Sequence, residues 1–590
     1  MPLVSASDVS SKTFDYIIVG SHLQTAGLTL ANRLSEDPNI CILVLEAGPA
    51  NINDPAICTL RNCLHFVLSP DFDPSASSVP QKHANGVEYA WPRGKTLGGS
   101  SAINFMVWTR PPKQELDDLE KLGNPGWNWE TLDKSLKKIE GYVKPSAEAV
   151  KKYDLKVENW TNGADGTLSH SFQGNIIHAD VVWRDVGYFL PTGVFFTTNT
   201  IDPVKHTRSY STTAFYLPAK DRKNFLVVVD SLVSRLITKM SANGMVVAQE
   251  VEFINGGETH TVKIGKEVVL SAGALKSPQI LELSGIGRKE VLDKAGIPIV
   301  IDLPGVGENL QEHIFTGVSF ELKNDVDFDT VDLLRDPEHL KKHLDLHEEG
   351  KGLFTTGILG FSFAPLQRYS PRADAIHREA IEKFENNKDQ YPPGLRDQLK
   401  IQTDRLKSGG PGCELVTIPG FLSFPNPPKS STKYWTVLSA QNHLFSRGNV
   451  HITTKNPKVD PAYDPHYFEE KIDLDTFVET IRFIRHLKEV APFKDIVVAE
   501  VNPGPNCTTD EQIADWLKNY MATTYHTAAT CSMLPKDKGG VVDPELKVYG
   551  TSNVRICDLS ILPLHFASHP QVTIYSFAQR AAEIIRGTAA

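Results

Sequence analysis

The opening of the chain alternates strand and helix patterns in an order that constrains the fold more than any other feature. The apolar run 15–20 ends at Gly20 and predicts a buried strand, and small residues with helical apolar spacing follow over 25–34. A second apolar run, 41–45, ends at Glu46. In a dinucleotide site the helix N-terminus attracts the pyrophosphate, and the acid after the second strand accepts hydrogen bonds from ribose hydroxyls. The opening therefore predicts an α/β fold with a Rossmann-like nucleotide-binding domain.

The turn between that strand and helix departs from the GxGxxG pattern. The segment Gly20-Ser21-His22-Leu23-Gln24-Thr25-Ala26-Gly27 is two residues too long and lacks the middle glycine. That glycine normally lets the backbone approach the phosphates closely, so its loss should weaken binding. Three explanations stay open: the loop bulges outward and still presents its amides, the protein binds the cofactor poorly or not at all, or the extra stretch is an error of gene-model splicing. Gly20, Thr25 and Gly27 are the candidate phosphate-binding residues.

Size and charge exclude several other classes of protein. A chain of 590 residues exceeds what one hydrophobic core normally supports, so two or more lobes are expected. The formal net charge of -10 argues against nucleic-acid binding. No apolar run of about 18 residues predicts a membrane span, and residues 1–13 lack a secretory signal pattern. Seven cysteines without CxxC spacing favour reduced thiols over a disulfide framework or a zinc site. We expect a cytoplasmic protein with no metal.

Three longer motifs identify the family that the chain resembles. Residues 92–104 read Pro-Arg-Gly-Lys-Thr-Leu-Gly-Gly-Ser-Ser-Ala-Ile-Asn, 271–287 begin Ser-Ala-Gly-Ala and end Ser-Gly-Ile-Gly, and 303–313 run from Leu-Pro-Gly-Val-Gly to a histidine. In this order they resemble signatures of the glucose–methanol–choline (GMC) oxidoreductase family. Three further segments are most similar to the group of fungal glucose oxidase, versicolorin B synthase and patulin-forming enzymes: 108–113, 126–129 and 535–550.

The resemblance implies FAD as the cofactor and adds residues that would hold it. Gly99 belongs to a glycine pair that permits a backbone shape forbidden to residues with a Cβ, which lets amides meet the flavin and its phosphates. Ser100 and Asn104 supply short polar groups for the cofactor. Val233 occupies the position whose backbone contacts adenine in the family, and Asp558 lies on a family position near the flavin.

The resemblance also places a catalytic pair near the carboxyl end. Residues 525–533 resemble the family segment H-P-x-G-T-C-x-M, so His526 falls on its catalytic histidine, although Thr527 and Ala529 replace the proline and the glycine. His569 falls where family members carry a second histidine or an asparagine. His526 and His569 are therefore the predicted catalytic residues.

Alcohol oxidation gives each histidine of the pair a role. The hydroxyl proton must leave while a hydride passes from the carbon to flavin N5, and a histidine that titrates near neutrality can be the base. We interpret His526 as that base and His569 as its hydrogen-bonding partner, which stabilises developing alkoxide charge. By the same motif test, His313 and His565 are ordinary histidines, and Cys531 is a buried packing residue.

The sequence narrows the class of substrate and the type of reaction but does not decide either of them. Glucose oxidases carry an arginine four residues before the catalytic histidine and an asparagine two before it, where this chain has Ala522 and Thr524. Sugar hydroxyls would then be buried unpaired, so we predict an aryl, allylic or secondary-metabolite alcohol rather than glucose. Oxygen or another acceptor would take up the electrons. Two alternatives remain: a non-redox cyclase or dehydratase like versicolorin B synthase, and a degenerate or mis-spliced protein without activity.

By resemblance the chain divides into two discontinuous domains, α+β overall. The second domain is expected to hold an antiparallel sheet with helices, with strands at 434–438 and 448–452 and a helix at 373–385. The block 325–427 is where relatives vary, so it is expected to choose the substrate. The FAD-binding domain is predicted to comprise 12–50, 84–110, 221–320 and 525–590. The substrate-binding domain, with a flavin lid, is predicted to comprise 51–83, 111–220 and 321–524.

Overall fold

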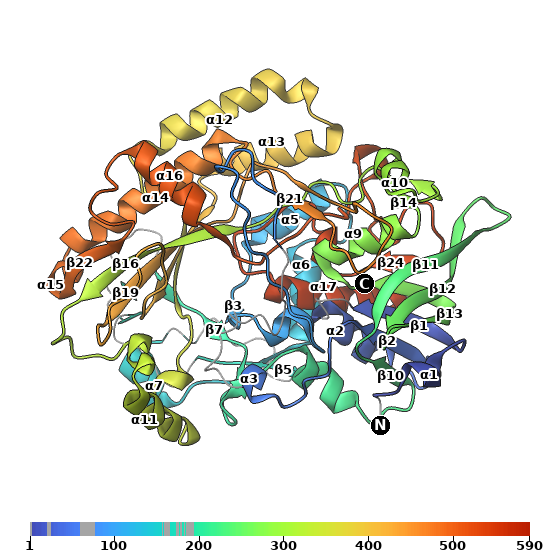
Figure 1. The fold of residues 1–590 in the computed structure, drawn as a ribbon, viewed down its shortest axis with the longest axis horizontal. Helices are drawn as coiled ribbons and strands as arrows, with labels where there is room; N and C mark the ends of the chain where they lie inside the picture. Colours follow the sequence, from blue (N-terminus) through green and yellow to red (C-terminus); the bar gives the residue numbers. More distant parts are fainter. Residues whose placement is uncertain are drawn as a thin grey trace.

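A computed structural model describes most of the chain (Figure 1). The described residues are 3–20, 25–58, 77–155, 157, 166–172, 176, 180–181, 183–184 and 194–589. Residues 21–24 of the altered glycine turn, on which the three explanations for that turn depend, lie outside this set. None of the described helices combines the length and the apolar character needed to cross a bilayer.

The first sheet confirms the Rossmann-like arrangement predicted from the opening of the chain. Its strand order is β10-β2-β1-β13-β12-β11, and β24 also pairs with β13. The pairs around β1 are parallel, as a strand–helix–strand crossover requires, whereas β12 runs antiparallel to both of its neighbours, β11 and β13. The strands are β1 (Thr13–Gly20), β2 (Ile42–Glu46), β10 (Phe225–Val228), β11 (Leu232–Met240), β12 (Val246–Asn255), β13 (Glu258–Leu270) and β24 (Val554–Ile556).

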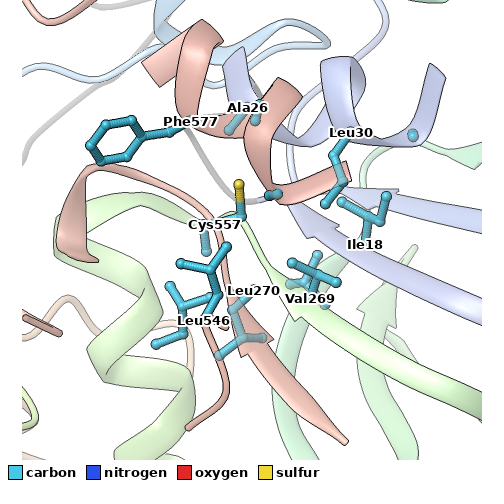
Figure 2. Packing of buried hydrophobic residues seen from close by; sticks show 14 of the residues in the cluster. Ile18, Ala26, Leu30, Val269, Leu270, Leu546, Cys557 and Phe577 are labelled. Carbon is cyan, nitrogen blue, oxygen red and sulfur yellow. The ribbon is translucent and has the colours of Figure 1, made fainter. Parts of the chain in front are cut away.

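Two helices from opposite ends of the sequence cover this sheet. Helix α2 (Thr25–Leu34) follows β1, and the C-terminal helix α17 (Gln571–Ile585) packs against α2. Figure 2 shows Leu30 of α2 close to Ile18 of β1, within one buried apolar cluster. A Cβ at Gly27 would lie 3.2 Å from Cγ2 of Ile18, so glycine allows α2 to approach the sheet closely.

The second sheet is antiparallel throughout, as the family resemblance implies. Its strand order is β22-β16-β19-β18-β17-β6, and β23 also pairs with β16. Figure 1 shows it on the side of the molecule opposite to β1 and β2, with α14 (Lys471–His486) and α16 (Asp510–Tyr520) beside it. Helices α12 (Ala373–Asn387) and α13 (Pro393–Ser408) lie along the top of that view. The strands are β6 (Phe195–Phe196), β16 (Ile314–Leu322), β17 (Gly360–Ala364), β18 (Cys413–Ile418), β19 (Tyr434–Gln441), β22 (Val497–Asn502) and β23 (Ala522–Thr523).

The side chains of this sheet alternate between two environments. Leu415 of β18 and Val437 of β19 belong to the same apolar cluster as residues of helix α14 (Lys471–His486). Val416 and Leu438, one residue further along each strand, line a cavity on the other face. Because successive side chains of a strand point to opposite faces, the same strands build both a core and a cavity wall.

Several element predictions can be compared with the structure directly. The predicted helix 373–385 is α12 (Ala373–Asn387), and the predicted strand 434–438 lies within β19. The prediction that 448–452 joins the same sheet is wrong: β20 (Asn449–His451) pairs with β21 (Ala462–Asp464) in a separate two-stranded sheet. Its apolar pattern fits a strand but does not specify the partner. The two-domain division stays a prediction, and β16 continues across its boundary at residue 320.

Candidate active site

A buried carboxylate joins the two segments that carry the histidines. Oε1 of Glu312 accepts hydrogen bonds from the backbone N–H of His526 at 2.7 Å and from that of His313 at 2.9 Å. Oε2 accepts the hydroxyl of Thr527 at 2.5 Å. Burial raises the pKa of the Glu312 carboxyl, and the guanidinium of Arg93, 3.6 Å from Oε2, acts in the opposite direction. Glu312 therefore fixes the backbone on both sides of the cluster.

Thr527 stands where the family has proline, and its hydroxyl is fully engaged. In addition to Glu312, it contacts the indole N–H of Trp91 at 2.8 Å and the guanidinium of Arg93. A proline could make none of these bonds. The substitution thus accompanies a buried polar cluster directly behind His526.

The loop that presents His526 has two left-handed residues. Tyr525 has φ 66° and Ala529 has φ 78°, in a region that disfavours residues with a Cβ. Ala529 stands where the family pattern has glycine, which explains why glycine suits that position. Backbone strain of this kind is characteristic of functional sites.

The two predicted catalytic histidines face each other. The ring centroids of His526 and His569 lie 4.9 Å apart, and both side chains line the same cavity. Nε2 of His569 donates to Oε1 of Glu414 at 2.7 Å, and its backbone N–H donates to Thr109 Oγ1 at 2.9 Å. The structure thus brings together two histidines that are 43 residues apart in the sequence.

His526 also touches two further histidines on the side away from the cavity. Its Nδ1 lies 3.0 Å from Nδ1 of His313, and its backbone carbonyl accepts Nε2–H of His565 at 2.6 Å. The rings of His313 and His565 are tilted by 39° to each other, with centroids 3.7 Å apart. His313 and His565, interpreted from the sequence as ordinary histidines, thus both contact the predicted base. The sequence signal that could have indicated His313 is its place at the end of the third motif, 303–313.

Burial keeps this cluster uncharged. Desolvation, followed by the neighbouring histidines, lowers the pKa of both His526 and His313 well below the ordinary histidine value, and burial lowers the pKa of His565 to about 4. At neutral pH all three rings are therefore neutral. A neutral imidazole has a free lone pair and can accept a proton.

The cavity has a space of about 1440 Å³, part of it open to solvent, and its two sides differ in character. One side is apolar and comes mainly from the antiparallel sheet and the loops beside it. The other side carries predicted cofactor residues. The apolar side is formed by Phe315, Ile358, Val416, Leu422 and Leu438, and the cofactor side includes Thr25, Ser100, Asn104 and Asp558.

The remaining predicted cofactor residues do not line the cavity. Gly20 and Glu46 end the paired strands β1 and β2, and the backbone N–H of Ser231, two residues before Val233, donates to the carbonyl of Glu46 at 2.7 Å. Gly99 has φ 54° and begins a short helical turn, 99–102. None of these residues, nor Gly27, lines the cavity itself.

The order of these motifs decides the family. The sequence profile of GMC oxidoreductases matches residues 14–315 with its N-terminal part and residues 445–578 with its C-terminal part. The chain belongs to the GMC oxidoreductase family. The predictions of this family and of a mixed α/β fold are therefore confirmed, as are FAD as the cofactor and an oxidoreductase class acting on CH–OH groups.

Similar proteins span nearly the whole chain of this GMC oxidoreductase. Patulin synthase of Aspergillus clavatus is 30% identical, over 98% of this chain and 92% of its own. The solved structure of an FAD-dependent oxidoreductase from Chaetomium thermophilum is 28% identical with a TM-score of 0.88, over 97% of this chain and 99% of that one. A fungal aryl-alcohol oxidase is 26% identical with a TM-score of 0.84, over 97% and 98%.

The residues present fit the nucleotide part of FAD. Glu46 is fully buried at the end of β2, and its Oε2 has no hydrogen-bond partner among the described residues. A ribose hydroxyl would satisfy this oxygen, since a buried carboxylate left unpaired is costly. Asp558 is different, because its carboxylate already accepts Gly273 N–H at 2.8 Å and Ser277 Oγ–H at 2.5 Å. Asp558 thus holds the N-terminus of helix α9 (Gly273–Leu283) at the cavity wall.

Within the described part of the chain, no group of three or more histidine, cysteine, aspartate or glutamate side chains could hold a metal ion. The side chains of the candidate site that sequence reasoning missed are Glu312, Glu414 and Asn442, whose Nδ2 lies 3.3 Å from Nδ1 of His313. Glu414 and Asn442 come from β18 and the residue after β19, so only the pairing of these strands brings them to the histidines.

Proposed function

We propose that this GMC oxidoreductase oxidises an aryl or secondary-metabolite alcohol, with His526 as the base. The observation that carries the proposal is the pair of facing imidazoles, 4.9 Å apart, in a cavity with an apolar wall. FAD, when bound, supplies the acceptor for the hydride. Thr25, Ser100, Asn104 and Glu46 would hold it, beside Gly20, Gly27, Gly99 and Val233, and Asp558 would position the wall.

The two imidazoles would divide the work on the substrate hydroxyl. His526 is neutral at pH 7 because its pKa is well below the ordinary value, so it can accept the hydroxyl proton. His569 donates Nε2–H to Glu414, so Nδ1 is the atom left to meet the substrate oxygen. When protonated, that Nδ1 would donate to the oxygen and stabilise developing negative charge.

The shape and chemistry of the cavity support an aromatic rather than a sugar substrate. Phe315, Val416 and Leu438 offer apolar contacts to a ring. Thr524 lines the cavity where glucose oxidases carry an amide, and its hydroxyl donates to the carbonyl of His313. A sugar would thus lose polar partners, at a cost of about 1–3 kcal/mol for each buried hydroxyl. Likeness to patulin synthase and to a fungal aryl-alcohol oxidase supports the same class.

The absorption spectrum of the purified protein tests this proposal. We expect bound flavin that bleaches anaerobically with benzyl or cinnamyl alcohol and is not bleached by glucose. Reoxidation by oxygen compared with a quinone dye then identifies the electron acceptor. Bound flavin that no alcohol reduces would favour the non-redox cyclase or dehydratase. Colourless folded protein that FAD cannot reconstitute would exclude any redox role.

A further inference from the structure

We propose that Asn442 and His313 are positioning residues that set which nitrogen of His526 carries the proton. The proposal rests on the proposed function of His526 as the base. Its physical content is a row of hydrogen bonds, Glu414–Asn442–His313–His526, in which the carboxylate of Glu414 fixes the direction of donation, and Asn442 and His526 share the one lone pair of His313 Nδ1. The same row begins at the carboxylate that holds His569.

The direction of hydrogen-bond donation is fixed at the end of the row where Glu414 lies. Nδ2 of Asn442 lies 3.0 Å from Oε2 of Glu414, and a carboxylate oxygen can only accept there. The amide group of Asn442 is therefore oriented with its two hydrogens on this side. Nδ2 also lies 3.3 Å from Nδ1 of His313, so the second hydrogen points at that nitrogen. Nδ1 of His313 must accept.

Because Nδ1 of His313 accepts, it also determines which nitrogen of the proposed base, His526, carries the proton. Nδ1 of His526 lies 3.0 Å from the same accepting nitrogen, so it must donate. If His313 carried its proton on Nδ1 instead, that hydrogen would meet the N–H of Asn442 inside a buried cluster, which costs free energy. A neutral His526 with its proton on Nδ1 has its lone pair on Nε2. Nε2 is thus the basic atom left for a substrate.

The burial of the row keeps this direction stable. His313 and Asn442 are buried, and the pKa of His313 is well below the ordinary value, first because of burial and then because of the neighbouring histidines. A protonated His313 would donate from Nδ1 to His526, and the low pKa of His313 excludes that form at neutral pH. His565 adds a fixed contact from another side, because its Nδ1 accepts Phe566 N–H at 3.0 Å and its Nε2–H is donated to the carbonyl of His526.

Asn442→Asp should reverse the direction of hydrogen-bond donation between His313 and His526 with almost no change in side-chain volume. An aspartate beside Glu414 brings at most one proton, which the two carboxyl groups would share, and so offers no hydrogen to His313. His313 would then carry its proton on Nδ1, and His526 would shift its own proton to Nε2. The matched control is Asn243→Asp in the exposed turn between β11 and β12, where Oδ1 accepts Met245 N–H and an aspartate accepts equally well.

Nitrogen-15 NMR of histidine-labelled holoenzyme tests the proposal. The His526 signals are assigned by their loss in His526→Gln. We expect the Nδ1–H form in the wild type and in Asn243→Asp, and the Nε2–H form in Asn442→Asp. His313→Gln, whose amide oxygen can accept the same hydrogen bond, should keep the Nδ1–H form. An Nε2–H form in the wild type, or an unchanged form in folded Asn442→Asp, would overturn the proposal; the wild-type result stands whether or not the variant folds.

Flavin reduction by the fastest alcohol of the panel gives the second readout. We expect Asn442→Asp to reduce its flavin about 10²-fold or more slowly, the scale of a lost general base, with alcohol affinity changed only a few-fold. Equal reduction rates in Asn442→Asp and the wild type would contradict the proposal. His526→Gln distinguishes the two levels. If it reduces its flavin at the wild-type rate, the proposed function fails; if it is inactive while wild-type His526 carries its proton on Nε2, only the role of Asn442 and His313 fails.

Discussion

At the scale of single residues, the departures from the family pattern are matched by local chemistry. Thr527 replaces a proline and bonds with Trp91, Arg93 and Glu312. Ala529 replaces a glycine and accepts a left-handed backbone. The first change adds hydrogen bonds behind His526, and the second adds strain beside it. These effects could not be deduced from the sequence, because a motif shows which residue is replaced but not what lies around it.

Ala529→Gly should stabilise the protein. Ala529 has φ 78°, where a Cβ destabilises the folded state by about 1–2 kcal/mol. Glycine removes this strain, but the greater freedom of the unfolded chain offsets less than about 1 kcal/mol of the gain. We expect a rise of up to about 1 kcal/mol in the free energy of unfolding, measured by chemical denaturation. Ala528→Gly, beside it and without a positive φ, is the control and should destabilise. A loss of stability in Ala529→Gly would contradict the strain.

Thr527→Val should lower the stability of the protein and change the polar surroundings of His526. Valine has a similar shape but leaves buried polar groups of Trp91, Arg93 and Glu312 short of a partner, which costs about 1–3 kcal/mol. The midpoint of chemical denaturation measures this loss. An unchanged midpoint would show that the hydroxyl is not part of a tight cluster.

At the scale of elements, the sequence predicts those helices and strands that pack against their neighbours along the chain. The strand, helix and strand at 15–45 could be read from apolar patterns, because each packs against its neighbours in sequence. The cavity wall could not be predicted. Which face of β18 and β19 meets α14 and which meets the cavity is decided by strand pairing over long separations, as the wrong placement of 448–452 also shows.

Alanine substitutions on the two faces of β18 should affect different properties, stability on one face and substrate preference on the other. Leu415 is buried against the helices, so Leu415→Ala should cost about 2–5 kcal/mol of stability and leave substrate preference unchanged. Val416 faces the cavity, so Val416→Ala should change stability less and shift the ratio of kcat/KM for aromatic alcohols of different size by about tenfold. Thermal unfolding and steady-state kinetics measure the two effects. Equal effects on both faces would contradict the assignment.

At the scale of the whole molecule, residues from both parts of the fold line one cavity together with the predicted catalytic histidines. The Rossmann-like sheet positions the predicted cofactor residues, the antiparallel sheet supplies the apolar wall, and the loop of His526 joins both through Glu312 and its hydrogen bonds. Sequence motifs predicted the pair His526 and His569 because the family pattern is specific. They did not predict the surrounding cluster, which only folding assembles.

This buried cluster should make the protein sensitive to acid. His565 has a pKa of about 4 in the folded state, below the ordinary 6.5, so the unfolded state binds a proton that the folded state does not. Its contribution to stability is present above pH 6.5 and is lost as pH falls toward 4, by an amount on the order of 3 kcal/mol. Chemical denaturation between pH 7 and 4 measures the slope, and His565→Asn should flatten it. An unchanged slope in that variant would show that His565 is not buried as a neutral group.

The reduction rate of the bound flavin in His526→Ala tests the account most directly. The variant should keep its flavin colour, because the substitution changes none of the residues proposed to hold FAD. With the alcohol that bleaches the wild type, mixed anaerobically in a stopped-flow instrument, its reduction should be about 10²–10⁴-fold slower, since the base is gone. A variant that bleaches at the wild-type rate would show that another group removes the proton.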